Sequence, residues 1–282
     1  MILITIKDGS LLTADMEIIC VGNELLIGKT VNTNAQWMGK QATSLGVNVK
    51  RITTVQDIVD EIANVIREAI VRKPQFIVTT GGLGPTFDDK TLEGIGKALN
   101  LKLEINEKAL AMVKARYAQY SITRHLPETE MTPARTKMAT LPEETEPISN
   151  PVGSAPGVHV DLKGTILFAL PGVPSEMEAI FTETIVPLLK QVVGDRVFCQ
   201  KSMFVDNMME SRLAPLIDRV MSANKGVYIK SHPIGAENKP HLEIHLTASA
   251  KYEEKPMETI MKAVKQLAVL VEQNGGIAIV EP

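Results

Sequence analysis

The 282-residue sequence is poor in cysteine, in excess charge and in long apolar runs, and each shortage excludes a class of protein. Cys20 and Cys199 are the only cysteines, and neither has a cysteine or histidine nearby at metal-ligand spacing. We therefore expect two buried, reduced thiols and neither a disulfide nor a zinc site. The formal net charge of -3 gives no general attraction for nucleic acid or anionic lipid, so any polyanion binding must be local.

Signals for membranes and for several common enzyme classes are also missing. No segment approaches the roughly 18 continuous apolar residues that a membrane span requires. The N-terminal segment lacks a basic region, and its apolar run is too short for a signal peptide. We therefore expect a cytoplasmic protein without a membrane partner. A Gly-x-Ser-x-Gly elbow, a Walker-type loop and a Rossmann glycine fingerprint are absent from the sequence, so the site must be found from other signals.

Strand and helix patterns alternate in the first half of the chain. The expected strands are Glu17–Val21, Val47–Thr53 and Gln75–Thr80, and the expected helices are Asn32–Leu45 and Asp57–Lys73. Asp57 is interpreted as the N-terminal cap of its helix. This order at short spacing predicts an α/β domain with a mostly parallel sheet in three layers.

A domain boundary is predicted at Gly194-Asp195. Before it, a helix is expected over Asn106–Ala118. The polar segment Ser121–Glu146, with one short helix at Pro133–Met138, is interpreted as an excursion packed beside the sheet whose charges are mostly solvated. After it, three strand patterns and two helix patterns predict a small α+β domain. His241 and His245 follow a strand pattern there, which places both on the outward face and not at zinc-ligand spacing.

Three loops rich in glycine or proline follow strand patterns: Gly22–Gly28, Gly81–Asp89 and Pro171–Glu176. Because ligands of such sheets bind at the carboxyl ends of the strands, we expect these loops to form one pocket. A glycine-rich turn at this position brings bare backbone N–H groups up to an anionic ligand such as phosphate. The sequence therefore predicts a pocket for an anionic ligand.

Glu24, Asp88 and Asp89 are the acidic residues that these loops bring together. One interpretation is that they hold a divalent cation, which bridges phosphate oxygens, or that they activate a water molecule. The alternative is helix capping, and it applies most directly to Asp89, which precedes a helix pattern starting at Leu92.

Together these motifs resemble the competence-damage-inducible protein A (CinA) family of the molybdopterin-binding-domain superfamily. The matching pieces are Gly22-Asn-Glu-Leu-Leu-Ile-Gly28, Asn32–Asn34, Gly81–Asp89 with Thr91, Asn150–Gly157 and Leu170–Met177. The resemblance implies a MoaB/MogA-like fold for residues 16–195, a KH-like α+β domain for residues 196–282, and a homodimer. Residues 1–15 are then an N-terminal extension.

Two departures from the family limit what the resemblance implies. The nicotinamide-nucleotide amidase domain of longer members is not present in this sequence, so that activity is not expected. Gly235-Ala-Glu-Asn238 stands where a Gly-x-x-Gly loop would be sought in the KH-like domain. Nucleic acid is accordingly not expected as a partner.

The resemblance implies hydrolysis of ADP-ribose to AMP and ribose 5-phosphate with a divalent metal ion of the Mg, Mn or Co class. The catalytic residues would be Asp88, Asp89 and Glu24, with Asp88 and Glu24 holding the metal and an activated water attacking one phosphorus in line. The residues assigned to the nucleotide are Gly81, Gly82, Gly84, Thr86, Asn34, Asn150, Gly153, Gly157, Pro171, Gly172 and Glu176.

Two alternatives to this activity stay open from the sequence. Relatives in the same superfamily bind molybdopterin and adenylylate it, or insert molybdate, and their loops share the Gly-Gly and Asp pattern. The other alternative is a non-catalytic nucleotide sensor or nucleic-acid adaptor that acts through the second domain.

Overall fold

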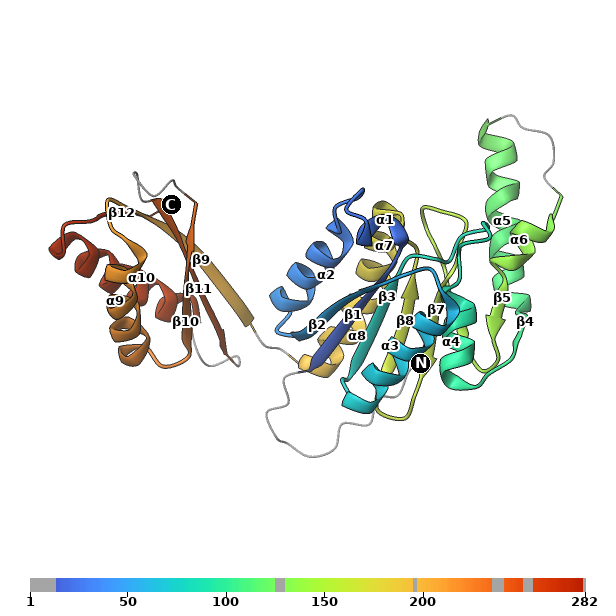
Figure 1. Cartoon of the computed structure of the whole chain (residues 1–282), viewed down its shortest axis with the longest axis horizontal. Coiled ribbons are helices and arrows are strands. Elements are labelled where there is room, and N and C mark those ends of the chain that lie inside the picture. The colour runs from blue at the N-terminus through green and yellow to red at the C-terminus, as the bar shows by residue number, and fades with distance from the viewer. Residues whose placement is uncertain (1–13, 125–129, 195–196, 235–240, 251–255, 281–282) are drawn as a thin grey trace. The chain divides into compact units, whose positions relative to one another are not determined.

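The computed structural model describes residues 14–124, 130–194, 197–234, 241–250 and 256–280, and it divides into two compact units (Figure 1). One unit comprises Met1–Thr43 and Val47–Val193, and the other comprises Ser44–Gly46 and Gly194–Pro282. The proposed N-terminal extension lies outside the described residues, apart from its last two positions. The Gly235-Ala-Glu-Asn238 segment lies wholly outside them.

Six strands form the central sheet of the first unit in the order β2-β1-β3-β8-β7-β6. They are β1 (Asp15–Val21), β2 (Asn48–Val55), β3 (Phe76–Thr80), β6 (Glu146–Ile148), β7 (Gly157–Asp161) and β8 (Ile166–Leu170). Neighbouring strands from β2 to β8 pair in parallel, whereas β7 pairs antiparallel with both β8 and β6. The prediction of a mostly parallel α/β sheet is therefore confirmed.

Helices cover both faces of this sheet and make three layers (Figure 1). The helices on one face are α2 (Thr33–Ser44), α7 (Pro174–Ile180) and α8 (Val186–Val193), and those on the other are α3 (Val59–Arg72) and α4 (Thr91–Leu99). A short π-helical turn, Phe181–Ile185, joins α7 to α8. Trp37 of α2 packs edge-on against Phe181 with ring centroids 5.5 Å apart. Because apolar layers lie on both faces, β3 and β8 are buried along their whole length.

The segment between α4 and β6 contains the two helices expected from the sequence and two short strands that were not expected. It holds β4 (Leu103–Ile105), α5 (Glu107–Arg124), α6 (Pro133–Lys137) and β5 (Thr140–Pro142), with β4 and β5 paired antiparallel. Met138, Ala139 and Leu141 are buried in the core beneath α3 and α4. The excursion is therefore packed against the sheet as predicted, and the charged side chains of its second half are exposed or half-buried.

The second unit is a four-stranded antiparallel sheet in the order β10-β11-β9-β12 with two helices packed on one face. Its elements are β9 (Val197–Asp206), α9 (Glu210–Ala223), β10 (Val227–Pro233), β11 (His241–Ala250), α10 (Pro256–Gln273) and β12 (Ile277–Val280). His241 and His245 alternate with buried Leu242 and Ile244, so the prediction that both histidines face outward is confirmed.

Two further expectations can be compared with the described residues. Cys20 and Cys199 are both free, but only Cys20 is buried, and Cys199 is half-buried. Within the described part of the chain, the helices are all too short or too polar to cross a membrane.

Candidate functional site

The loops at the carboxyl ends of β1, β3 and β8 line one pocket of about 450 Å³. The prediction that these loops converge is confirmed. The lining residues that were expected from the sequence are Glu24, Asn34, Gly81, Gly82, Gly84, Asp88, Asp89, Pro171, Gly172 and Glu176. Four other expected residues, Thr86, Asn150, Gly153 and Gly157, are not part of the lining.

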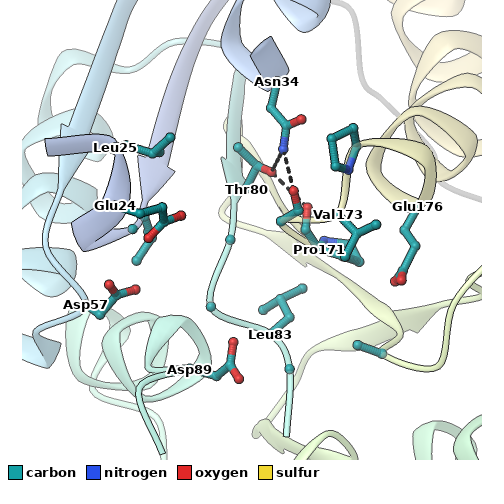
Figure 2. A pocket seen from close by; sticks show the side chains of 18 of the residues that line it. Glu24, Leu25, Asn34, Asp57, Thr80, Leu83, Asp89, Pro171, Val173 and Glu176 are labelled. Atoms are coloured by element: carbon teal, nitrogen blue, oxygen red, sulfur yellow. Dashed lines mark hydrogen bonds between the residues drawn. The ribbon is translucent and has the colours of Figure 1, made fainter. Parts of the chain in front are cut away.

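The pocket is strongly acidic. Glu24, Asp57 and Asp89 lie on one side and Glu176 lies on the other, as Figure 2 shows, and Asp88 completes the lining carboxylates. Among the described lining residues there is no lysine, arginine or histidine. A phosphate ligand would therefore meet repulsion here unless a cation accompanied it.

Asp57 is a site residue that sequence reasoning missed. The expectation that it caps α3 is wrong, because Ile58 is the N-cap and no side chain caps this helix. The Asp57 carboxylate instead accepts a hydrogen bond of 2.7 Å from the backbone N–H of Asn23. Burial raises the pKa of Asp57, and the charges of Glu24 and Asp88 raise it further. Its place just after β2 was the available signal, since that is a strand carboxyl end like the others.

Thr86 ties together the two carboxylates of the glycine loop. Its hydroxyl oxygen lies 2.5 Å from Oδ1 of Asp88 and 2.5 Å from Oδ2 of Asp89, and its N–H donates to Asp89 Oδ2 at 2.8 Å. The hydrogen bond from Thr86 lowers the pKa of Asp88. The expectation that Asp89 caps α4 is wrong, because Lys90 is the N-cap and makes no side-chain capping bond.

The backbone N–H groups of Gly82, Leu83 and Gly84 have no hydrogen-bond partner within the described part of the chain. Gly81 differs, because its N–H donates to the carbonyl of Leu170 at 3.0 Å and is not available to a ligand. A Cβ at Gly81, where φ is 103°, would overlap the carbonyl of Val21. Gly81 is thus required for the conformation of the turn, and the N–H groups of the next three residues are the donors available to a ligand.

Asn34 is fixed at the back of the pocket (Figure 2). Its Nδ2 donates to Thr80 Oγ1 at 3.0 Å and to the carbonyl of Gly172 at 2.9 Å, while Thr80 Oγ1 donates to the carbonyl of Pro171 at 2.8 Å. Its Oδ1 is buried and has no partner among the described residues. The Asn34 side chain therefore joins the end of β3 to the loop after β8, and its Oδ1 is left without a partner among the described residues.

The loop before β7 is closed on itself. Asn150 Oδ1 accepts from the N–H groups of Val152 and Gly153 at 3.0 and 2.7 Å. Asn150 Nδ2 donates to Glu176 Oε2 at 2.7 Å and to the Ala155 carbonyl at 2.8 Å. Asn150 and Gly153 therefore support the loop, whose Ser154 and Ala155 reach the pocket.

Gly157 begins β7 and is needed for packing. A Cβ there would lie 3.2 Å from the carbonyl oxygen of Ala169 and 3.4 Å from Ile148, so a larger residue would press on the neighbouring strands. Gly157 is therefore explained by close contact inside the sheet.

The chemistry of the pocket suits a hard divalent cation that a ligand helps to hold. Among the described residues no group of three or more His, Cys, Asp or Glu side chains could hold a metal alone. Ions such as Mg²⁺ are commonly held by one or two carboxylates together with phosphate oxygens and waters. Asp57 interacts electrostatically with both Glu24 and Asp88, so these three carboxylates gather on one wall. The residues present fit such an ion.

Comparison with known proteins gives consistent matches. Residues 17–191 match the family described as "Probable molybdopterin binding domain". A protein of Caldivirga maquilingensis is 45% identical over 252 residues, which cover 89% of this chain and 94% of that protein. A protein of Aeropyrum pernix is 42% identical over 260 residues, covering 92% and 94%. The crystal structure of the protein CinA, with unknown function, from Thermoplasma acidophilum is 42% identical with a TM-score of 0.57, covering 62% of this chain and 98% of that one.

Proposed function

The chain belongs to the molybdopterin-binding-domain family as a CinA-like member, and on this premise we propose that it hydrolyses the pyrophosphate bond of ADP-ribose, giving AMP and ribose 5-phosphate, with a divalent cation. One observation carries the proposal. Three free N–H groups, at Gly82–Gly84, lie in the same loop as the carboxylates of Asp88 and Asp89. A pyrophosphate would supply acceptors for the N–H groups, and a cation held by the carboxylates would balance the negative charge.

The side chains around the pocket have separate roles in this proposal. Asp88 and Glu24 would hold the cation, which when bound neutralises phosphate charge and lowers the pKa of a coordinated water. Asp57 lies on the same wall as Glu24 and Asp88, and its carboxylate would accept a proton from the attacking water. The N–H groups of Gly82–Gly84 would stabilise charge on the non-bridging phosphate oxygens in the transition state.

Release of AMP from ADP-ribose tests the proposal. The purified chain is assayed with Mg²⁺, Mn²⁺ or Co²⁺ and, as the control, with a chelator. We expect AMP and ribose 5-phosphate in equal amounts with a cation and neither product with the chelator. Absence of AMP with every cation, at saturating ADP-ribose, would contradict the proposal.

A molybdopterin ligand is the second candidate, and the family match itself favours it. Molybdopterin also carries a phosphate, so it would use the same N–H groups at Gly82–Gly84. Calorimetric titration with ADP-ribose, ATP and molybdopterin separates the two candidates. Tight binding of molybdopterin, together with no AMP release from ADP-ribose, would replace the first proposal with the second.

Two further expectations belong to the same proposal. We propose that the protein is a homodimer, following the CinA resemblance. Sedimentation velocity should then give the mass of two chains. The alternative of a nucleic-acid adaptor requires RNA binding that weakens steeply with salt. We expect none at physiological salt, given the net charge of -3.

A further inference from the structure

The loop Gly81–Asp89 is a thin wall with a cavity on each side. On one side is the acidic pocket, and on the other is a second cavity of about 560 Å³. Gly82, Leu83, Gly84 and Asp89 line both cavities. Leu83 is packed in the hydrophobic core, but residues 85–88 at the tip are exposed, so hydrogen bonds and not packing must hold the shape of the tip.

The beginning of the loop is anchored to the sheet. The Gly81 N–H donates to the carbonyl of Leu170, and the Thr91 hydroxyl donates to the carbonyl of Gly81 at 2.7 Å. The Thr91 N–H donates to the carbonyl of Gly82 at 3.1 Å. These bonds fix the point where the chain leaves β3, but they do not reach the tip at residues 85–89.

The tip is held from behind by Lys137, at the end of α6. Its ammonium group donates to the backbone carbonyls of Thr86 and Asp89, the latter at 2.7 Å. Within the described residues, no other side chain from outside the loop makes a hydrogen bond to positions 85–89. Lys137 is 51 residues from Thr86 in the sequence and lines the second cavity, not the acidic pocket.

Burial of the Lys137 side chain lowers the pKa of its ammonium group, and the charge of Asp89 opposes this change. Taking an ammonium group partly out of water is costly unless it is hydrogen-bonded. The two carbonyls and the nearby carboxylates offset that cost, so this lysine has a defined place. It is not a solvated surface charge.

We propose that Lys137 is the positioning residue of the acidic pocket: it holds the carbonyls of Thr86 and Asp89 so that the loop stays in the shape that presents its free N–H groups and carboxylates to a ligand. The effect on ligand binding rests on the proposed function, in which the ligand is ADP-ribose. The effect on the loop itself does not depend on that function.

Lys137→Met tests the proposal, because methionine keeps much of the apolar stem and removes the ammonium group. Lys90→Met is the matched control, since Lys90 adjoins the same loop but pairs with Glu93 at 2.9 Å. Lys137→Arg keeps a charged donor. The first measurement is amide hydrogen exchange without ligand, followed by NMR at Gly81, Thr86 and Asp89, whose N–H groups are hydrogen-bonded.

In Lys137→Met we expect exchange at Thr86 and Asp89 to be about tenfold faster, because two hydrogen bonds from a charged donor are lost. Exchange at Gly81, at the root of the loop, should be unchanged. Lys90→Met should match the parent protein, and Lys137→Arg should recover most of the protection. Unchanged exchange at Thr86 and Asp89, or faster exchange throughout the first unit, would overturn the proposal. If Lys137→Met does not fold, Lys137→Gln is measured in its place under the same criteria.

The second measurement is ADP-ribose binding with Mg²⁺ by calorimetry. We expect Kd to rise about tenfold in Lys137→Met and to stay within twofold in Lys90→Met. If the loop loosens while Kd is unchanged, the positioning role is overturned. If the parent protein neither binds nor cleaves ADP-ribose, the proposed function fails. In that case Kd is measured with inorganic pyrophosphate and Mg²⁺. The proposal for Lys137 then stands if Kd rises about tenfold in Lys137→Met and stays within twofold in Lys90→Met, and it is overturned if Kd is unchanged in Lys137→Met.

Discussion

Two loops line the acidic pocket and use their polar groups in opposite ways. Gly81–Asp89 leaves three N–H groups and two carboxylates available to a ligand, whereas Asn150–Gly157 pairs the amide of Asn150 within the loop and with Glu176. Both loops are held by a cation from the α5–α6 segment. Lys137 reaches the first, and Arg116 donates to the carbonyls of Pro151 and Val152 in the second. This difference suggests that Gly81–Asp89 binds the ligand, whereas Asn150–Gly157 supports the wall of the pocket. We call Asn150–Gly157 the supporting loop.

The largest expected effect is a loss of activity on substitution of Asp88 in the loop Gly81–Asp89. Asp88→Asn should lower kcat/KM for ADP-ribose by about 100-fold or more, because the amide is a weaker ligand for a divalent cation. Because Asp88 is exposed, the melting temperature should be unchanged. The matched change for the second loop is Glu176→Gln in α7, because the Glu176 carboxylate accepts a hydrogen bond from Asn150 of that loop. It keeps an acceptor for Asn150, so activity should stay within about fivefold. Equal losses in the two variants would remove the distinction between the loops.

The sequence predicts the fold well where burial is continuous. β3 and β8 are buried on both faces, and α3 has one apolar stripe, so strand and helix patterns are clear. The loops could then be placed at one edge, because parallel strands share their carboxyl ends. The strands β4, β5, β6 and β12 were missed because each has only three or four residues, too few to show an alternating pattern.

Most residues that line the pocket could be predicted from the sequence, but Asp57 was missed and the roles of the acidic residues could not be predicted. An acidic residue before a helix has the same local pattern whether it caps the helix or lines a pocket. For Asp57 the partner is the N–H of Asn23, 34 residues away, and for Asp89 it is Thr86 within the loop. Lys137 gave no local signal, because its partners are about 50 residues away in sequence. Tertiary contacts therefore decided the roles of Asp57 and Lys137, and a contact within the loop decided the role of Asp89.

The second prediction concerns a substitution that adds a methyl group to the supporting loop, Asn150–Gly157. A Cβ at Gly153 would overlap the carboxylate of Glu176, and displacing that carboxylate would break its hydrogen bond from Asn150, so Gly153→Ala should lower the free energy of unfolding of the first unit by about 0.5–1.5 kcal/mol. Gly39→Ala in α2 is the control, because nothing lies within 4 Å of its Cβ. That change should raise stability by about 0.5–1 kcal/mol, since glycine weakens a helix interior. Urea unfolding measures the free energy of unfolding of both variants. An unchanged value for Gly153→Ala would show that the Glu176 side chain moves aside without cost.

The third prediction compares the two cations. Arg116→Met removes hydrogen bonds to the carbonyls of Pro151 and Val152, so it should lower the stability of the first unit by about 1 kcal/mol. The Asn150 network remains, so the Kd for ADP-ribose should stay within about twofold, in contrast to the effect expected for Lys137→Met. Calorimetry on both variants makes the comparison, with Arg116→Lys as the charge-preserving control. A tenfold rise in Kd for Arg116→Met would contradict this prediction, because it would show that the second loop also contributes to ligand binding.

The smallest expected effect concerns His159 in β7, the strand that continues from the supporting loop. Its Nε2 is buried without a partner among the described residues, and its ring lies 5.4 Å from that of Phe168. Burial lowers the pKa of His159 below its usual 6.5, while Asp161 and Glu146 oppose that change. As pH falls below 6.5, the unfolded chain therefore takes up a proton before the folded chain does, and the free energy of unfolding decreases.

His159→Phe keeps a ring against Phe168 and removes this titration. Its melting temperature should therefore fall less than that of the parent protein between pH 7.5 and pH 5.5, when both are measured by calorimetry on the first-unit transition. The difference should correspond to less than about 1 kcal/mol, because solvent screens a half-buried ring. His232→Phe is the control, since that ring is exposed on the second unit and should leave the first-unit transition unchanged. A steeper pH dependence in His159→Phe would mean that the carboxylates of Asp161 and Glu146, and not burial, control this histidine.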